Sequence, residues 1–251
     1  EMSRLVVLLA AVYFGTVAST PTTSPCETRT DNAPCIHVPP CHKGVAVATD
    51  FKVSDAKGDV PARQETKVQI CHDAVGLRVH TVAADTDIFC PWTHCNDPVF
   101  QDCDVLEVFS APVWHVTDNP EFYHEVDTGA SGALWAGVYD NPKGNASDCE
   151  HCVAGNLNCT GLADFGHHGP SARVHNDTMS WSNVLTLPWA LYPPEFGIHW
   201  PNHLWPLWRI NFYRYDYPDG RTKPYELSAW SPTHDPSFHV PARFGVMVLE
   251  P

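Results

Sequence analysis

Flat aromatic rings and planar polar groups recur on one face of two predicted strands, and a sugar ring requires such side chains. Trp135, Tyr139 and Asn141 are separated by even numbers of residues, so all three lie on one face of an extended strand. In a second segment, Arg209 and Asn211 alternate with apolar residues in the same way. An aromatic ring can cover the apolar face of a pyranose, and amide or guanidinium groups can bind its hydroxyl groups. We therefore predict carbohydrate binding through these residues.

A carboxylate joins this set in the segment that spans residues 102–109. Leu106 and Val108 alternate with Glu107 there, so the carboxylate and the two apolar side chains lie on opposite faces of a predicted strand. We predict that Glu107 binds sugar hydroxyl groups. A structural alternative stays open, because a buried carboxylate needs a partner and Arg209 or Arg214 could pair with it.

The same carboxylate could instead take part in catalysis. Glycoside hydrolases use two carboxylates about 5 to 10 Å apart, and Glu107 with Glu125 or Asp127 on the next predicted strand could form such a pair. The sequence contains no nucleophile elbow, no Ser-His-Asp signature and no HExxH motif. An enzyme is therefore the less favoured interpretation, and no organic cofactor is expected.

Acidic side chains also gather around Cys90 and Cys95. Asp85, Asp87 and Asp97 offer carboxylate oxygens, the ligands that calcium prefers, and so they predict a calcium site. The ordinary acidity of an exposed loop is the alternative.

The cysteines indicate an oxidising compartment. There are ten of them: Cys26, Cys35, Cys41, Cys71, Cys90, Cys95, Cys103, Cys149, Cys152 and Cys159. An even number in an exported chain predicts up to five disulfides, whose pairing the spacing leaves open. A zinc site on the last three cysteines is the less favoured interpretation in such a compartment.

Targeting and linker features occupy the first 43 residues. Arg4 precedes an apolar run and small residues, which predicts a secretory signal peptide over residues 1–19. Residues 20–43 are rich in Thr, Pro and Cys and are expected to form a disulfide-stapled arm. We therefore expect a secreted, extracellular protein whose mature chain has no membrane span.

N-glycosylation signals support export. Asn145, Asn158 and Asn176 each begin an Asn-x-Ser/Thr sequon. All three lie within residues 140–178, a segment without a strand pattern that we interpret as a glycan-bearing insertion.

The formal net charge of −14 narrows the class of ligand. Nucleic acids and anionic membranes both require a basic protein surface, so neither is expected as a partner. A neutral poly- or oligosaccharide or a divalent cation is compatible with this charge.

Short segments of alternating apolar residues recur along the chain from Gly44 onward. They cover residues 44–53, 68–71, 77–82, 102–109, 122–127, 133–139, 179–189, 208–213 and 244–249. The turn over residues 72–76 predicts that the second and third of these segments form a hairpin. No helical period persists beyond about two turns, and 23 prolines disfavour a helix-rich fold. The sequence predicts an all-β protein with few helices, an antiparallel β-sandwich of the immunoglobulin-like or jelly-roll type over residues 44–251.

Motifs in the C-terminal fifth resemble a known family. They are Trp208-Arg-Ile-Asn-Phe-Tyr-Arg214, Trp230-Ser-Pro232, Phe238-His-Val-Pro241 and Arg243-Phe-Gly245, preceded by the weaker segment Asp104-Val-Leu-Glu107-Val-Phe109. In this order they resemble the family 9 carbohydrate-binding modules and their secreted DOMON-like relatives, from roughly Gly44 to Leu249.

This resemblance implies a β-sandwich that binds saccharides, commonly with structural calcium. In the family, two aromatic rings enclose the terminal sugar, and a glutamate with arginine and asparagine donors binds its hydroxyl groups. Glu107 matches the glutamate. Phe100-Gln101 stands where a tryptophan is expected, and Tyr123-His124-Glu125 stands where the arginine and asparagine are expected.

Two other functions stay open. The incomplete match and the Cys-rich arm favour a structural or interaction subunit of an assembly of extracellular or cell-wall glycoproteins. Haem binding is known among DOMON-like relatives and would use Met179, Met247 or one of the 15 histidines as an axial ligand.

Overall fold

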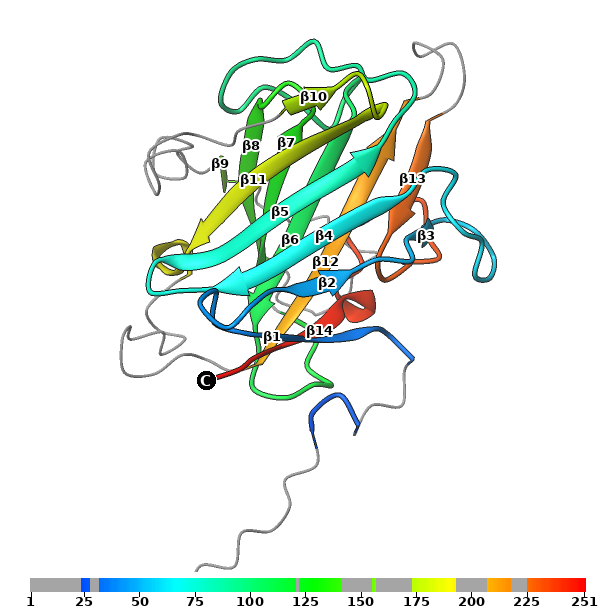
Figure 1. Ribbon diagram of the computed structural model, residues 1–251. Coiled ribbons are helices and arrows are strands. Elements are labelled where there is room, and N and C mark those ends of the chain that lie inside the picture. The colour runs from blue at the N-terminus through cyan, green and yellow to red at the C-terminus, as the bar shows by residue number, and fades with distance from the viewer. Residues whose placement is uncertain are drawn as a thin grey trace, which may run out of the picture.

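Two β-sheets packed face to face make up the described part of the protein (Figure 1). The computed structural model describes residues 24–27, 32–120, 122–140, 155–156, 173–192, 207–217 and 225–251. The helical elements within these ranges are two single turns of 3-10 helix, η2 (Trp189–Leu191) and η4 (Pro241–Arg243). The predicted all-β sandwich is confirmed.

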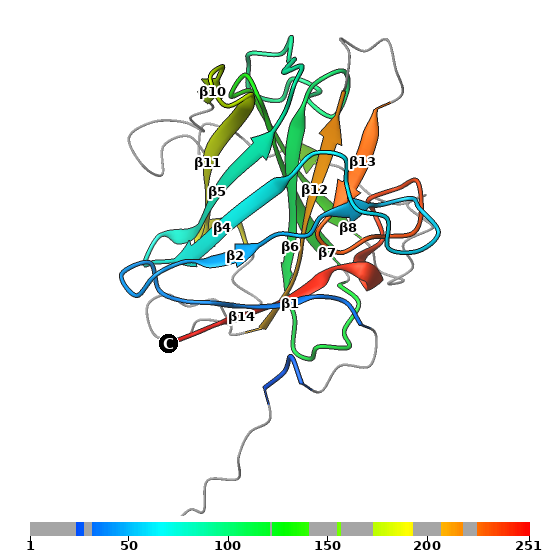
Figure 2. The same cartoon turned by 45° about the vertical axis from the view of Figure 1, so that its right-hand side comes forward.

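The larger sheet has nine strands. Its main path is β1 (Cys35–Val38), β14 (Gly245–Leu249), β12 (Leu207–Asp216), β6 (Val105–Pro112), β7 (Phe122–Gly129), β8 (Leu134–Asp140) and β9 (Gly155–Asn156). At one side, β13 (Glu226–Ala229) pairs with β12, beside which it lies in Figure 2, and with β3 (Lys52–Val53). The β1–β14 pair is parallel, so the sheet includes four residues of the segment that the sequence assigns to the arm.

The smaller sheet has five antiparallel strands. They follow the order β10 (Arg173–His175), β11 (Ser180–Pro188), β5 (Gly76–Ala84), β4 (Thr66–His72) and β2 (Ala46–Ala48). The predicted hairpin between β4 and β5 is confirmed, and Asp73 closes its turn by accepting the N–H groups of Val75 and Gly76. A Cβ atom at Gly76 would lie 2.1 Å from the carbonyl oxygen of Leu187, so this close approach requires glycine.

Strand alternation sends alternate residues of β6 to different environments. Leu106 and Val108 lie in the core between the sheets, whereas Glu107 and Phe109 lie on the outer face of the nine-stranded sheet. Tryptophans fill much of the core: Trp181 and Trp208 are fully buried and Trp230 is 9% exposed.

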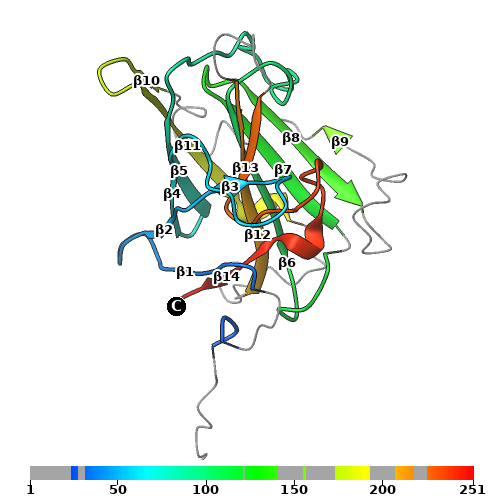
Figure 3. The same cartoon turned by 90° about the vertical axis from the view of Figure 1, so that its right-hand side faces the viewer.

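A loop covers part of the outer face of the nine-stranded sheet. This loop, residues 230–244 between β13 and β14, lies on the side away from the five-stranded sheet (Figure 3). Phe238 and Phe244 of the loop form a second apolar cluster with Phe109, Tyr123 and Tyr213. The face thus acquires a partial third layer, and the candidate site lies at its margin.

Disulfides tie the N-terminal segments to the sandwich. The structure contains Cys26–Cys35, Cys41–Cys71 and Cys90–Cys103, and Cys95 is disulfide-bonded as well. Cys149, Cys152 and Cys159 lie outside the described residues, as does the predicted signal peptide.

Two strands, β9 and β10, fall within residues 140–178, which the sequence predicts to be irregular. Asn176 is exposed in the turn after β10, whereas Asn145 and Asn158 lie outside the described residues. No helix in the described part of the chain has the length and apolarity to cross a membrane.

Candidate functional site

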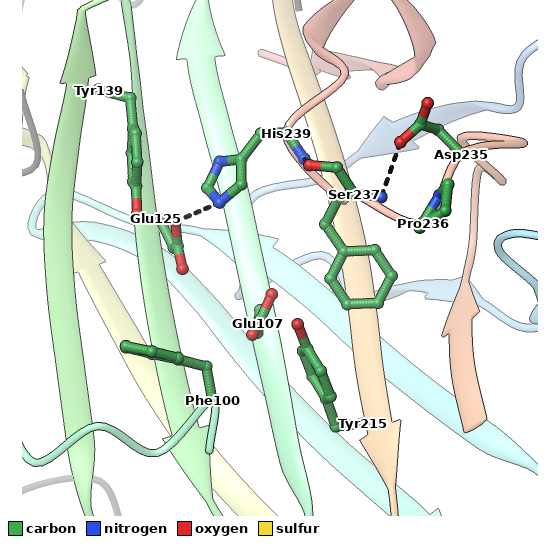
Figure 4. A pocket seen from close by; sticks show the side chains of 10 residues that line it. Phe100, Glu107, Glu125, Tyr139, Tyr215, Asp235, Pro236, Ser237 and His239 are labelled. Carbon is green, nitrogen blue, oxygen red and sulfur yellow. Dashed lines mark hydrogen bonds and ion pairs between the residues drawn. The ribbon is translucent and has the colours of Figure 1, made fainter. Parts of the chain in front are cut away.

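A cavity of about 440 Å³ opens on the outer face of the nine-stranded sheet (Figure 4). Three of the central strands contribute Glu107, Glu125 and Tyr215, and β8 contributes Tyr139. The loop 230–244 forms the opposite wall. The cavity therefore combines the rigid pleat of the sheet with a wall that the loop supplies.

Aromatic rings form most of the walls. Tyr139 packs against His239 with 4.5 Å between ring centroids, and Tyr215 packs against Phe238 at 5.2 Å. Phe100 completes the wall from the loop before β6. These rings pack against one another, so they present fixed apolar surfaces to the cavity.

Three carboxyl groups gather beneath these rings. Glu107 on β6 lies opposite Asp127 on β7, and Glu125 lies two residues away on the same face of β7. One oxygen from each side chain lies within 4.8 Å of the others. Glu107, Glu125 and Asp127 are 2%, 3% and 0% exposed, so the three residues are buried. We call them the open cluster, because several of their oxygens accept no hydrogen bond from the surrounding structure. Figure 4 shows Glu107 and Glu125 between the rings of Tyr139 and Tyr215.

Burial disfavours the charged form of each member of the open cluster. It raises the pKa of Glu125 to about 8, although the Tyr139 hydroxyl group acts in the opposite direction. Burial and the nearby Glu125 raise the pKa of Glu107 well above its usual range. Burial, and then the two glutamates, do the same to the pKa of Asp127. Without a bound cation, the cluster therefore retains protons near neutral pH.

His239 is the basic side chain in contact with this cluster among the described residues. Its Nε2 atom lies 3.7 Å from Oε2 of Glu125, and its Nδ1 atom lies 2.9 Å from the Tyr123 hydroxyl oxygen. Burial lowers the pKa of His239 to about 4, so the ring is neutral at pH 7. The neutral ring leaves the carboxyl groups without a compensating positive charge from His239.

Several oxygens of the open cluster accept no hydrogen bond from a group outside the cluster in the described structure. They are Oε2 of Glu125 and both carboxylate oxygens of Asp127. Buried polar atoms are almost always hydrogen-bonded in folded proteins, so such atoms indicate a group that receives a proton or a ligand.

The structure brings two of the predicted sugar-binding residues into the cavity and leaves others outside its lining. Glu107 and Tyr139 line it. Trp135 is on the same face but only 7% exposed. Its ring covers Gly137, where a Cβ atom would lie 2.4 Å from the ring, and it packs edge-on against Phe100. Trp135 therefore supports the wall from behind.

Arg209 and Asn211 also lie on this face, but they bind the backbone of the loop 230–244. Arg209 donates to the carbonyl of Ala242 at 2.8 Å, and Asn211 donates to the carbonyl of Ser231 at 2.7 Å. The N–H of Ser231 in turn donates to Asn211 at 2.9 Å. These two side chains fix the loop that forms one wall. Asn141 lies outside the described residues.

The three predicted calcium ligands do not form one group. Asp85 is buried and accepts a hydrogen bond from the N–H of Asp87, and it pairs with Arg214 on the inner face of the sheet. Asp97 accepts the N–H groups of Thr93 and His94 in an exposed turn. Arg214 thus pairs with Asp85, not with Glu107 as the structural alternative supposed.

The sequence did not single out several members of the site. The sequence predicts Glu125 and Asp127 only as possible catalytic partners of Glu107, and it predicts Phe238 only as part of a motif that resembles the family. Strand alternation could have found the two carboxyl groups, because a register that sets residue 107 opposite residue 127 places all three on one face. No pattern in the sequence predicts that Phe238 of the loop packs against Tyr215 of β12.

Solved structures with a similar fold include carbohydrate-binding proteins. A protein from Bacteroides uniformis, provisionally described as carbohydrate-binding, has a TM-score of 0.62 at 17% identity, covering 87% of this chain and 100% of its own. A family 9 carbohydrate-binding module from Caldicellulosiruptor kristjanssonii gives 0.50 in complex with cellotriose and 0.52 with glucose, each at 9% identity and over 86% of this chain. These matches cover 93% and 95% of the module. At sequence identities this low, the structural similarity shows a shared fold and nothing more.

Sequence comparison gives one named relative. A protein described as an extracellular protein from Arthroderma benhamiae is 24% identical over 226 residues, covering 86% of this chain and 90% of the relative. No family model matches the sequence.

Proposed function

We propose that this protein is a secreted, non-catalytic carbohydrate-binding protein and that its ligand occupies the cavity on the outer face of the nine-stranded sheet. The observation that carries the proposal is the combination of aromatic walls with carboxyl groups beneath them. The extracellular relative and the fold shared with sugar-bound modules support it.

The wall and the floor of the cavity suit different parts of a sugar. The rings of Tyr139, Tyr215 and Phe238 can cover the apolar C–H face of a pyranose. Glu107 and Glu125 offer oxygens that accept hydrogen bonds from sugar hydroxyl groups. A cavity of about 440 Å³ lies within the range of small-ligand sites, which suits a sugar unit better than a long polymer groove.

A glycan array followed by calorimetry on the secreted full-length protein tests this function. We expect binding to at least one β-glucan, xylan or short oligosaccharide. Tyr215→Ala should weaken that binding at least about tenfold, because it removes a wall of the cavity. Trp114→Ala is the matched control, since its side chain is an aromatic that is 66% exposed outside the cavity. Equal loss in both variants, or no binding to any glycan, would overturn the proposal.

A reducing-sugar assay on every bound glycan separates binding from catalysis. Glu107 and Glu125 have carboxylate oxygens within 4.8 Å, close to the separation that retaining glycosidases use. We expect no new reducing ends. Hydrolysis that Glu107→Gln abolishes would replace the binding function with an enzymatic one.

An interaction subunit is the second candidate function, and one observation favours it. Val47 and Val184, on the outer face of the five-stranded sheet, are 45% and 47% exposed, and Val174 at its edge is 49% exposed. Gln69 and His80 lie between Val47 and Val184 across this face, and a protein interface commonly mixes exposed apolar side chains with polar ones in this way. A folded protein that self-associates through this face and binds no glycan would favour this function over the first.

A further inference from the structure

The open cluster has the dimensions of a cation site. Calcium binds oxygen ligands at about 2.3 to 2.6 Å, so two ligands of one ion lie no more than about 5 Å apart. One oxygen each from Glu107, Glu125 and Asp127 lies within 4.8 Å of the others, which meets this condition. Three carboxylates can supply up to six oxygens if each binds through both atoms. The ligand set contains only hard oxygen donors, which favours calcium over softer transition metals.

The oxygens of this cluster are also left open. Oε2 of Glu125 and both oxygens of Asp127 receive no N–H or O–H group from outside the cluster in the described structure, although the two residues are 97% or more buried. The two carboxyl groups contact each other. A second buried cluster, Asp85, Asp104 and Asp216, shows what a closed arrangement looks like. There every carboxylate oxygen accepts at least one N–H group. The open atoms of the first cluster are thus not a general property of buried carboxyl groups in this protein.

The cavity gives an ion a route to the cluster. Glu107 and Glu125 line it, and Figure 4 shows their carboxyl groups directed into the space between the aromatic walls. An ion held there would have Asp127 behind it and the cavity in front. Its remaining coordination positions would face the cavity, where water or a sugar hydroxyl group can occupy them.

We propose that Glu107, Glu125 and Asp127 bind a divalent cation, with calcium as the chemical match, at the floor of the cavity. The cation converts three carboxyl groups that compete for protons into one neutralised site. A sugar in the cavity then completes the coordination shell of the ion, and this second part rests on the proposed function. The site differs from the one predicted from the sequence at Asp85, Asp87 and Asp97.

Direct titration of the full-length protein tests the cation site without any sugar. After treatment with a chelator and its removal, CaCl₂ is titrated by calorimetry up to about 10 mM, a range that covers weak extracellular sites. Calcium at about 100 times Kd should raise Tm by roughly 5 to 10 °C. Terbium should give luminescence sensitised by the nearby Tyr139 and Tyr215, and calcium should displace it.

Isosteric variants locate the ion. Asp127→Asn and Glu125→Gln should each weaken calcium binding more than about 100-fold, because they remove ligands and not only their supports. The matched control is Asp97→Asn, a predicted ligand of the other site, which should bind calcium as the unmodified chain does. If both cluster variants fold, as circular dichroism would show, and still bind calcium while Asp97→Asn does not, the proposal is overturned. If neither cluster variant folds, the carboxyl groups of the unmodified protein can be amidated with a carbodiimide. Loss of terbium luminescence that prior calcium prevents would support the cation site. Amidation without an effect on the luminescence would overturn it.

Sugar titrations with and without the chelator separate this inference from the proposed function. Sugar binding that requires calcium supports both parts. Calcium binding with no sugar binding supports the cation site and overturns the proposed function. Sugar binding that is unchanged by the chelator, in a protein that does not bind calcium, overturns the cation site alone. Tight binding of glucosamine but not calcium would also overturn it, because an ammonium group would then be the cation.

Discussion

Two clusters of three buried carboxyl groups occur in the described residues, and they differ in what surrounds them. The closed cluster, Asp85, Asp104 and Asp216, lies at one end of the sandwich beside Arg214, and the open cluster lies on the outer face of the larger sheet. Both sets are buried, and both bring an oxygen from each residue within 4.8 Å of the others. Burial alone therefore does not decide what such a cluster does.

Arg214 and backbone groups complete the closed cluster. The guanidinium pairs with Asp85 and Asp216 at 3.2 Å each and donates to the carbonyl of Ala84 at 2.8 Å. Asp104 accepts the backbone N–H groups of Phe89 and Tyr217. Since β12 carries Arg214 and the smaller sheet leads into Asp85, this network links the two sheets. Its role is structural.

The open cluster has no such partner among the described residues, and it faces a cavity. A buried arginine therefore distinguishes a carboxyl cluster that has a structural role from one whose oxygens are available to a ligand. Motif spacing does not reveal this, because in the sequence Asp85 is one of the predicted calcium ligands and Arg214 lies near the predicted sugar ligands.

Removing the arginine should have the largest effect. Arg214→Met leaves Asp85 and Asp216 buried beside Asp104 without their cation, and breaking a buried ion pair costs about 3 to 5 kcal/mol. We expect urea unfolding to show a loss of this size. Arg243→Met is the control, because Arg243 is exposed and its loss should change the free energy of unfolding by less than about 0.5 kcal/mol. Similar losses in both variants would remove the distinction between the clusters.

Replacing a residue of the open cluster should raise the free energy of unfolding, whereas removing Arg214 lowers it. In the absence of a cation, Asp127→Asn removes a buried group whose ionisation is unfavourable. We expect this variant to be more stable than the unmodified protein by roughly 1 kcal/mol or more at pH 8, because the amide avoids the free-energy cost that the raised pKa of Asp127 represents. Urea unfolding in a chelator measures it. A loss of stability would mean that Asp127 has a structural partner after all.

The pH dependence of stability should separate the clusters next. Burial raises the pKa of Glu125 to about 8 from 4.5, so the folded protein binds this proton more tightly than the unfolded chain. Stability without a cation therefore falls as the pH rises from about 4.5 to 8, by up to about 1.4 kcal/mol per pH unit for one such group.

Other groups restrict the useful window of this experiment. Asp104, with a pKa raised to about 7, contributes in the same direction up to that pH. The depressed pKa of His239, about 4, contributes stability that is lost as the pH falls from about 6.5. The pKa values of Tyr139 and Tyr215, raised by burial, affect only strongly alkaline pH. The slope between pH 7 and 8 thus reports Glu125 with Glu107 and Asp127, and Glu125→Gln should reduce it. Saturating calcium should remove this slope, because the carboxylates would then be deprotonated in the folded protein as they are in the unfolded chain. A slope that neither Glu125→Gln nor calcium changes would contradict the assignment.

Much of the sandwich follows from local patterns in the sequence. The alternation of Leu106 and Val108 with Glu107 predicts which residues enter the core, and the turn at Asp73 predicts the β4–β5 hairpin. β1 has no such signal, because it joins β14 through a parallel pairing between opposite ends of the chain. Local periodicity cannot report a contact between residues so far apart in sequence.

The candidate site follows from the sequence less completely, for the same physical reason. Tyr139 and Glu107 were predicted because each lies on an alternating strand. The roles of Arg209 and Asn211 depend on a loop about 20 to 33 residues away, whose carbonyl groups they bind. Their polarity was visible, but whether it served a ligand or the backbone depended on tertiary contacts.

The smallest effect is expected at the acidic loop that the sequence singled out. Asp97 lies in an exposed turn, where backbone N–H groups of His94 and Thr93 lower its pKa. Asp97→Asn keeps an acceptor oxygen for these groups, so Tm should change by less than about 2 °C. If this variant lowers Tm much further in calcium than in a chelator, the exposed turn and not the open cluster is where calcium binds. Differential scanning calorimetry under both conditions makes this comparison, and it would show whether carboxylates without a buried arginine are sufficient to identify a cation site.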